Sequence, residues 1–405
     1  MNPDPPAVPV AAPRRSPSPW RALLFHVARP GSLVARALRR GAEAPEVHTP
    51  TPRVTTAGAI MDQHRGAGPG FDALRFYLSV AIVVYHAKQV VVGREVANYQ
   101  SSMLFPYLLA LVPIFFCLSG FLVTGSAMRN PSLRTFLTNR SLRIFPALTV
   151  EVALSALILG PWLTTVDWHD YFQNKKFFSY FGNIIGRVRM SLPGVFEQHP
   201  IPDTVNASLW TLQPEFYCYL IMTALMLSTL VYRRVMFTAM YVAVTLVLSF
   251  LNWRTDLGHP GDVFPGHVIV YYFATGIVAY HWVRSIPIHA ALFVLAAILS
   301  YCTITVPGLM FLASIPVAYC TIYIGLSKFP LIYPFNTGDY SYGIYLFNFP
   351  IQQTVVHFFP DVKEWWLLLL ISLPLTILFA AASWRLVEKP ALQLKRRWSK
   401  PLSPH

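Results

Sequence analysis

The sequence predicts an all-α, polytopic membrane protein with about ten transmembrane helices and both termini in the cytoplasm. Composition is the first reason, because 54% of the 405 residues are hydrophobic and only 12% are charged. Soluble proteins carry about 25% charged residues. The mean hydropathy is correspondingly high, at +0.46. The second reason is that apolar runs of spanning length recur from residue 71 onward. The third is the distribution of Lys and Arg between alternate connections.

The charge of the chain is strongly unbalanced, with 32 Lys and Arg against 18 Asp and Glu. In a soluble domain such an excess would indicate a nucleic-acid partner. In so apolar a chain it is typical of basic cytoplasmic loops, so we predict a lipid bilayer as partner and no nucleic acid. The cysteines fall inside apolar runs at unrelated spacings, which predicts core packing, with no metal site and no disulfide, for Cys117, Cys218, Cys302 and Cys320.

The first part of the chain differs from everything after it. Residues 1–60 are rich in Pro, Ala and Arg and lack a periodic apolar pattern, which predicts a disordered basic tail. Within them, residues 20–40 mix arginines with apolar residues, so they either lie on an anionic membrane surface or are simply part of the tail. A start of translation at Met61 would remove the tail altogether. Residues 61–405 form the predicted membrane domain.

Ten apolar runs are long enough to cross the hydrocarbon core, which takes about 20 helical residues. With the N-terminus inside, the inside segments hold 24 Lys and Arg and the outside connections hold 8. This asymmetry predicts that both termini are cytoplasmic. The runs lie at about 72–92, 103–124, 144–164, 208–230, 235–252, 264–283, 286–304, 307–326, 341–359 and 365–384.

The longest outside connection covers about residues 165–207. It mixes aromatic and polar residues and is too polar to span a membrane. A re-entrant or interfacial segment beside the membrane therefore fits it best. Loops of this length are more often functional or disordered than idle.

Two ionisable residues lie in the first apolar run, FDALRFYLSVAIVVYHA. Arg75 and His86 are eleven residues apart, which is about three helical turns plus 20°, so both side chains project from nearly one face. Along the axis they are about 16 Å apart. Arg75 then lies near the cytoplasmic interface and His86 near mid-membrane, where an ionisable group is a functional candidate. The alternative is that Arg75 anchors the interface and His86 is a packing residue.

Further ionisable residues lie at or inside later runs. Arg140 and Arg143 share a helix face and form a cationic pair at the cytoplasmic surface, although the preference for positive charge inside also accounts for them. Glu215 lies within the fourth run, where a buried carboxylate needs a partner or a proton. Pro214 beside it frees backbone groups to line a cavity. A purely structural contact is the alternative for Glu215.

Five stretches together resemble the acyltransferase 3 family of bacterial inner-membrane enzymes, which O-acylate surface and exported carbohydrates. They are the Arg75–His86 helix, FLTNRSLRIFPAL, SLWTLQPEFYCYL, GDYSYGIYLFNFPI and SWRLVEKPAL. The resemblance covers roughly residues 69–395. Each stretch alone is a weak signal, and the five in the order of the family are specific.

The resemblance implies roles for individual residues. His86 is implied to be catalytic, with Arg75 as its companion and Glu215 as the acid of a Trp-to-acid motif that begins at Trp210. Arg75, Arg140 and Arg143 are implied to bind the donor. The remaining matches are Tyr342, Gly343 and Tyr345 at the start of the ninth run, and Glu388 and Pro390 at the end. In one position the chain departs from the family: Asn348 stands where a histidine is often found. A relay through two histidines is therefore not expected, whereas a positioning role survives in Asn.

The chemistry implied by the resemblance is transfer of an acyl group, most often acetyl, from cytosolic acyl-CoA to a carbohydrate or glycolipid hydroxyl. Arginines at the cytoplasmic face suit the phosphates of acyl-CoA. His86 would act as general base, or would take the acyl group covalently. Glu215 would orient the imidazole or deprotonate the hydroxyl itself. The carbohydrate is expected on the outer side, near residues 165–207.

A different class of function also fits ten spans with intramembrane Arg, His and Glu, namely a secondary transporter with a substrate or proton site. Against it, no internal repeat relates the two halves of the sequence. The two alternatives differ in one observable, since a transporter leaves its substrate chemically unchanged.

Overall fold

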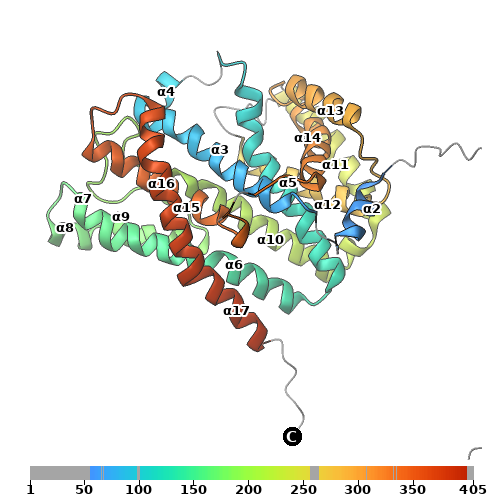
Figure 1. The fold of residues 1–405 in the computed structure, drawn as a ribbon, viewed down its shortest axis with the longest axis horizontal. Coiled ribbons are helices and arrows are strands. Elements are labelled where there is room, and N and C mark those ends of the chain that lie inside the picture. Colours follow the sequence, from blue (N-terminus) through green and yellow to red (C-terminus); the bar gives the residue numbers. More distant parts are fainter. Residues whose placement is uncertain are drawn as a thin grey trace, which may run out of the picture. The chain divides into compact units, whose positions relative to one another are not determined.

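The computed structural model describes residues 55–398 except 65, 67, 98–100, 256–263, 307, 332 and 334. In this part of the chain the regular elements are all helices, and the one β-type pairing is an isolated bridge between Thr56 and Pro287 (Figure 1). The predicted all-α class is therefore confirmed for the described residues. Residues 1–54, which make up most of the predicted tail, lie outside them.

Each of the ten predicted spans corresponds to a helix. The helices are α3 (Phe71–Val92), α5 (Phe105–Arg129), α6 (Leu133–Leu154), α10 (Leu212–Leu227), α11 (Arg234–Thr255), α12 (Gly266–His281), α13 (Ala290–Thr303), α14 (Met310–Leu326), α15 (Ser341–Phe358) and α16 (Trp365–Ser383). A π-helical turn (Ser155–Leu159) and α7 (Gly160–Leu163) prolong α6. A second π-helical turn (Trp384–Glu388) and α17 (Lys389–Trp398) prolong α16.

Four continuous helical stretches are long and apolar enough by themselves to cross a membrane. They are Phe105–Arg129, Leu133–Leu163, Arg234–Thr255 and Trp365–Leu394, and α13 and α14 are shorter apolar helices. The chain is thus a helical membrane protein, while the count of ten crossings and the cytoplasmic termini remain predictions. The helix that contains the third predicted span starts earlier than expected, at Leu133, because Ser132 caps it and the polar residues after the cap are helical too.

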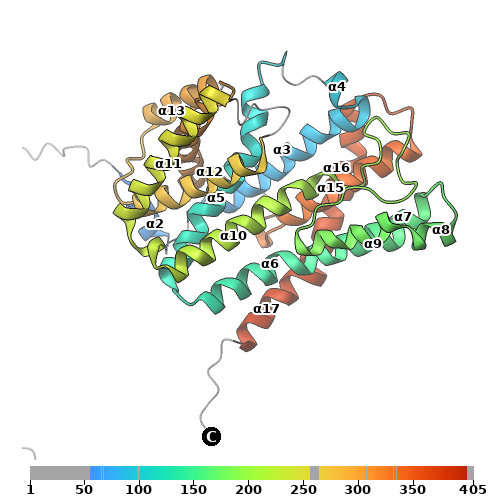
Figure 2. The same cartoon turned by 180° about the vertical axis from the view of Figure 1, so that it is seen from behind.

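Helix α5 packs closely against α12 through two glycines. A Cβ atom on Gly120 would lie 2.1 Å from the Phe273 carbonyl oxygen, and one on Gly276 would lie 2.1 Å from the Cys117 carbonyl oxygen. Neither position therefore accepts a side chain. Two further sets of helices pack together: α3 lies against α15 and α16, and α6 packs beside α10 and α17 (Figures 1 and 2). Helices α3, α5, α6, α10 and α15 enclose an internal space.

All four cysteines are free, as predicted. Cys117 and Cys218 are buried, which confirms core packing for these two. The same prediction is wrong for Cys302, which is exposed on α13, and Cys320 is intermediate. The reason is that α13 turns most of its apolar side chains outward, where a membrane protein meets lipid instead of its own core.

The boundary predicted at residue 60 is too late. Helix α2 (Ala57–Gln63) starts before it, and Thr56 caps the helix by accepting from the Ala59 amide. The Ala57 and Gly58 amides donate to the carbonyls of Ile286 and Val283 at 2.8 Å each. Residues 57–60 thus belong to the folded domain and not to a disordered tail.

The predicted outside connection at residues 165–207 contains α8 (Trp168–Gln173), α9 (Lys175–Tyr180) and a 3₁₀ turn (Phe181–Ile185). These helices are too short to cross a membrane. Tyr171 and Tyr180 are fully buried. The aromatic side chains of Trp168 and Phe178 are exposed, which agrees with the interfacial alternative of the prediction.

Candidate functional site

The described helices enclose a large cavity of about 470 Å³. A small cavity of about 30 Å³ adjoins it. Val112 and Tyr345 line both cavities. Six of the nine predicted site residues line the large one: Arg75, Arg140, Arg143, Glu215, Tyr342 and Tyr345. His86 and Trp210 line the small one.

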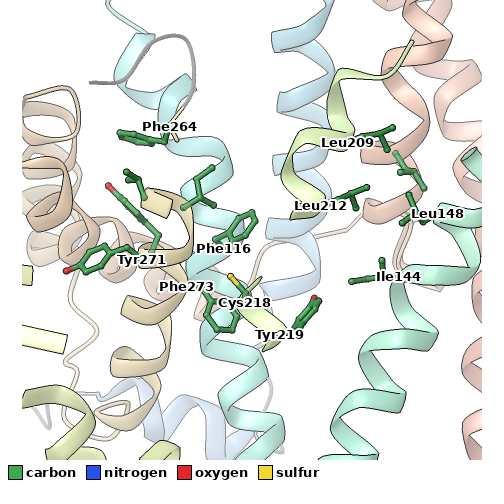
Figure 3. Close-up of a cluster of buried hydrophobic side chains, with 14 of the residues drawn as sticks. Phe116, Ile144, Leu148, Leu209, Leu212, Cys218, Tyr219, Phe264, Tyr271 and Phe273 are labelled. Carbon is green, nitrogen blue, oxygen red and sulfur yellow. The ribbon is translucent and has the colours of Figure 1, made fainter. Parts of the chain in front are cut away.

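Apolar side chains form most of the wall of the large cavity. Figure 3 shows Phe116 of α5, Ile144 of α6 and Leu212, Cys218 and Tyr219 of α10 converging on this region. Arg75, Arg140, Arg143 and Asp339 are gathered where α3, α6 and the segment before α15 meet, and this part is called the cationic end of the cavity. A mainly apolar wall with a cationic end suits a ligand that joins an apolar part to an anionic group.

Two of the three arginines are held by one carboxylate. Asp339, just before α15, accepts from Arg143 Nη2 at 2.6 Å and from Arg75 Nη1 at 3.1 Å. Arg75 Nη1 also donates to Asp72 at 2.8 Å. Burial by itself would raise the pKa of Asp339, but Arg143 and Arg75 hold that pKa well below its ordinary value. Asp339 is thus a carboxylate that fixes both guanidinium groups.

Arg140 differs from the other two arginines. Its Nε atom is buried and has no hydrogen-bond partner among the described residues, and the same is true of Asn139 Oδ1. Both residues line the large cavity. A buried donor without a partner is costly, so Arg140 is the arginine that most needs an anionic ligand.

His86 is 7% exposed, and its imidazole Nδ1 lies 3.0 Å from Asn348 Oδ1. The amide of Asn348 is oriented by its other contacts, because Nδ2 faces the backbone oxygens of Ile344 (3.2 Å) and Tyr345 and, more distantly, Ser208 Oγ (3.4 Å). Those atoms accept hydrogen bonds, so Oδ1 must be the atom that faces His86. Nδ1 of His86 then carries the proton, and Nε2 keeps a lone pair available as a base.

Glu215 lines the large cavity and accepts from the Tyr219 hydroxyl at 2.7 Å. The structure assigns the orienting contact on the His86 ring to Asn348 and not to Glu215. Of the two alternatives predicted for Glu215, orientation of the imidazole gains no support from this contact, and deprotonation of the hydroxyl stays a prediction. Glu215 lines the large cavity together with the arginines, whereas His86 lines the small one.

Tyr342 and Tyr345 tie α15 to its neighbours. The Tyr342 hydroxyl donates to the Ile144 carbonyl at 3.3 Å, and the Arg143 guanidinium lies over the Tyr342 ring at 5.9 Å. The Tyr345 hydroxyl lies 2.7 Å from Thr211 Oγ1 and donates to the Ser208 carbonyl at 3.0 Å. Tyr345 thus stands, with a fixed hydroxyl, between the cavity of the arginines and the cavity of His86.

Sequence patterns alone miss several polar residues of this region. Asp339 lies inside GDYSYG, and an acid two residues before a predicted span is a visible signal that could have singled it out. Glu151 lies inside the third predicted span, and an acid in an apolar run is the signal that singled out Glu215, so it too could have been found. Asn206 and Ser208 gave no signal, because their contacts join segments 55 to 140 residues apart. No group of three or more His, Cys, Asp or Glu side chains suited to a metal ion occurs in the described part of the chain.

Comparisons with known proteins identify the family of the chain. The family model described as "Acyltransferase domain" matches residues 69–385. The chain is similar to "O-acetyl transferase" of Shigella phage Sf6, with 28% identity over 302 residues, which covers 69% of this chain and 83% of the relative. It is also similar to "Nodulation protein 10" of Rhizobium leguminosarum bv. viciae, with 27% identity over 365 residues, 84% of this chain and 97% of the relative.

No solved structure matches the chain. The family model nevertheless spans most of the sequence and contains the helices that enclose both cavities. This protein therefore belongs to the acyltransferase family and is a membrane acyltransferase.

Proposed function

We propose that the protein moves an acetyl group from cytosolic acetyl-CoA to a hydroxyl of a carbohydrate or glycolipid on the outer side of a bacterial inner membrane. The observation that carries the proposal is the His86–Asn348 contact, which leaves Nε2 of a buried histidine free beside a cavity with a cationic end. The O-acetyl transferase among the relatives supports the reaction class.

The large cavity supports acyl-CoA as the donor. Its cationic end offers Arg75, Arg140 and Arg143 to phosphate groups, and guanidinium groups bind phosphate in a bidentate manner. Its mainly apolar wall accommodates the pantetheine arm. The thioester must then reach the small cavity past Tyr345, and the axial separation of Arg75 and His86, about 16 Å, is a span that such an arm can cover.

The small cavity supports acetyl as the transferred group. A cavity needs about 10–15 Å³ to hold one water molecule, so the cavity of about 30 Å³ beside His86 has room for about two. An acetyl group, with two carbons and one oxygen, is of that size. A longer acyl chain would collide with the aromatic walls provided by Tyr85, Trp210 and Phe264.

His86 supplies the proton chemistry. Nε2 takes the proton from the attacking hydroxyl, the new C–O ester bond forms at the thioester carbonyl, and the C–S bond breaks. The departing thiolate then receives the proton from Nε2, so the transfer is balanced. General base catalysis of this kind contributes about 10²–10⁴ in rate. Transfer through a covalent acyl-histidine uses the same free nitrogen and gives the same products.

An outer cavity of about 500 Å³ supports an approach for the carbohydrate from the side opposite to the arginines. It is lined by Val92, the last residue of α3, by Gly93 and Arg94 just after it, and by residues 200–202 of the predicted outside connection. Val92 lies six residues beyond His86, which is about 9 Å along the helix axis. Donor and carbohydrate would thus reach His86 from opposite ends of α3.

Acetyl transfer in membranes that contain the full chain tests the proposal. The membranes receive radiolabelled acetyl-CoA, and alkali-labile label is measured in the polysaccharide and glycolipid fractions of the expression strain. Wild type should incorporate label, and His86→Ala at equal protein level should not. The matched control is His267→Ala, because His267 is exposed on α12 and lines neither cavity.

Two results would overturn the proposal. Equal labelling by His86→Ala and wild type would remove His86 from the chemistry. Carbohydrate moved across the membrane without label, by wild type and in the presence of acetyl-CoA, would favour the transporter alternative instead.

A further inference from the structure

A proline opens the hydrogen-bond ladder of α15 next to Asn348. In a regular helix the Leu346 carbonyl accepts from the amide of residue 350, but Pro350 has no N–H. The structure supplies a replacement from another segment, since Asn206 Nδ2 donates to the Leu346 carbonyl at 2.9 Å. Asn206 thus holds the turn of α15 that contains Asn348.

Asn206 uses both of its donor hydrogens and its acceptor oxygen at this position. Its second Nδ2 hydrogen is donated to Glu151 Oε1 at 2.8 Å, and its Oδ1 accepts from the Ser208 amide at 3.0 Å. The Ser208 contact makes Asn206 the N-cap of the 3₁₀ turn Ala207–Thr211. That turn places Ser208 beside Asn348 and Trp210 at the small cavity. One side chain therefore joins two walls of the His86 site.

Glu151 in turn fixes Asn206. It is 1% exposed, and its Oε1 accepts from both Asn206 and Ser155 (2.9 Å), whereas Oε2 is buried without a hydrogen-bond partner among the described residues. A buried acid that is incompletely satisfied is expensive to keep. Glu151 lines neither cavity, so direct contact with the substrates does not explain its presence.

We infer that Glu151 is a positioning residue for acyl transfer. It acts through Asn206, which holds two segments in place around His86: the turn of α15 that contains Asn348, and the 3₁₀ turn that contains Ser208 and Trp210. This inference rests on the proposed function of His86. It adds a link between α6, which carries the cationic pair, and α15, which carries the partner of the imidazole. An error of about 1 Å in such a site costs about 10²-fold in rate.

The test compares kcat, KM for acetyl-CoA and Tm of the purified full chain. Glu151→Ala and Asn206→Ala should each lower kcat about 10- to 100-fold, with KM for acetyl-CoA within about threefold of wild type. Glu151→Gln should restore kcat to within about threefold of wild type, because its carbonyl oxygen accepts the same two hydrogen bonds. The double variant Glu151→Ala, Asn206→Ala should lose no more than the worse single variant, since the two act in series.

Asn174→Ala is the matched control. Asn174 caps α9 in the same predicted outside connection by the same kind of contact, since its Oδ1 accepts from the amide two residues on, but it lines neither the large nor the small cavity. Its kcat should equal that of wild type.

Several outcomes would overturn the inference. One is a normal kcat in Glu151→Ala while His86→Ala is inactive, which leaves the proposed function intact. Another is a loss in which kcat, KM and Tm all change together, as general destabilisation would produce. Full additivity in the double variant would show that the two residues act separately. Undiminished activity of His86→Ala would instead remove the proposed function itself.

Discussion

The two ends of the site are stabilised in different ways. At the arginine end, Asp339 holds Arg75 and Arg143 by charge, and these side chains are between 20% and 27% exposed. At the histidine end, His86 and Asn348 are joined by a hydrogen bond in the buried interior, with Asn206 and Glu151 behind them. Charge at a partly wet surface suits the capture of an anionic donor, whereas fixed hydrogen bonds in a dry interior suit the reacting groups. The arginine end should therefore control KM for the donor, and the histidine end should control kcat.

Removal of the imidazole partner should produce the largest effect after His86 itself. Asn348→Ala leaves Nδ1–H of His86 without its acceptor and lets the ring rotate, so kcat should fall about 10²-fold with little change in KM for acetyl-CoA. Steady-state kinetics on purified protein measure both constants. An increase in KM with an unchanged kcat would contradict the division between the two ends.

Neutralisation of Asp339 at the arginine end should have a smaller effect, and it should change KM instead of kcat. Asp339→Asn keeps the shape but removes the charge that fixes Arg75 and Arg143, so KM for acetyl-CoA should rise about tenfold, which corresponds to about 1.4 kcal/mol. kcat should change much less. Isothermal binding of CoA to the same variant offers an independent measurement, and unchanged affinity there would count against a donor site at the arginines.

The pH dependence sharpens the same comparison. Because the folded-state pKa of Asp339 is held below its ordinary value, its stabilising effect is fully present above the ordinary pKa and is lost only as the pH falls through the lowered one. Donor affinity should therefore be constant between about pH 5 and pH 8 as far as Asp339 is concerned. A drop in CoA affinity near pH 5 that disappears in Asp339→Asn would contradict this assignment.

A change remote from both ends should have the smallest effect on the reaction. A chain started at Met61 lacks the contacts of Ala57 and Gly58 with Ile286 and Val283. Each such hydrogen bond contributes about 0.5–1.5 kcal/mol, so the Tm should fall by a few degrees while kcat and KM remain those of the full chain. The Tm in detergent and the steady-state constants check this expectation. A large loss of activity at unchanged Tm would assign the first residues a role in the reaction.

The sequence predicted the helices well because apolar runs and the breaks between them are local features. It placed the start of α6 too late, since hydropathy detects the membrane and not the helix, and polar residues from Leu133 onward are helical. The separation of Arg75 and His86 on one helix face was likewise a local inference. Tertiary contacts could not be predicted from local patterns. Asn348, the partner of His86, is 262 residues away in the chain, and Asn206 is 140 residues from Leu346, to whose carbonyl it donates.

The small size of the cavity beside His86 affects how much of the donor is lost to hydrolysis. Thioesters are hydrolysed wherever a base and a water molecule meet, and a general base that waits in a wet pocket would consume acetyl-CoA without any product. The small cavity has room for about two waters, so under the proposed function an acetyl group that enters past Tyr345 would displace them. Without a water molecule beside the carbonyl, the donor would stay intact until a hydroxyl of the carbohydrate arrives. We expect the ratio of transfer to hydrolysis to depend on the bulk of the residues around that space.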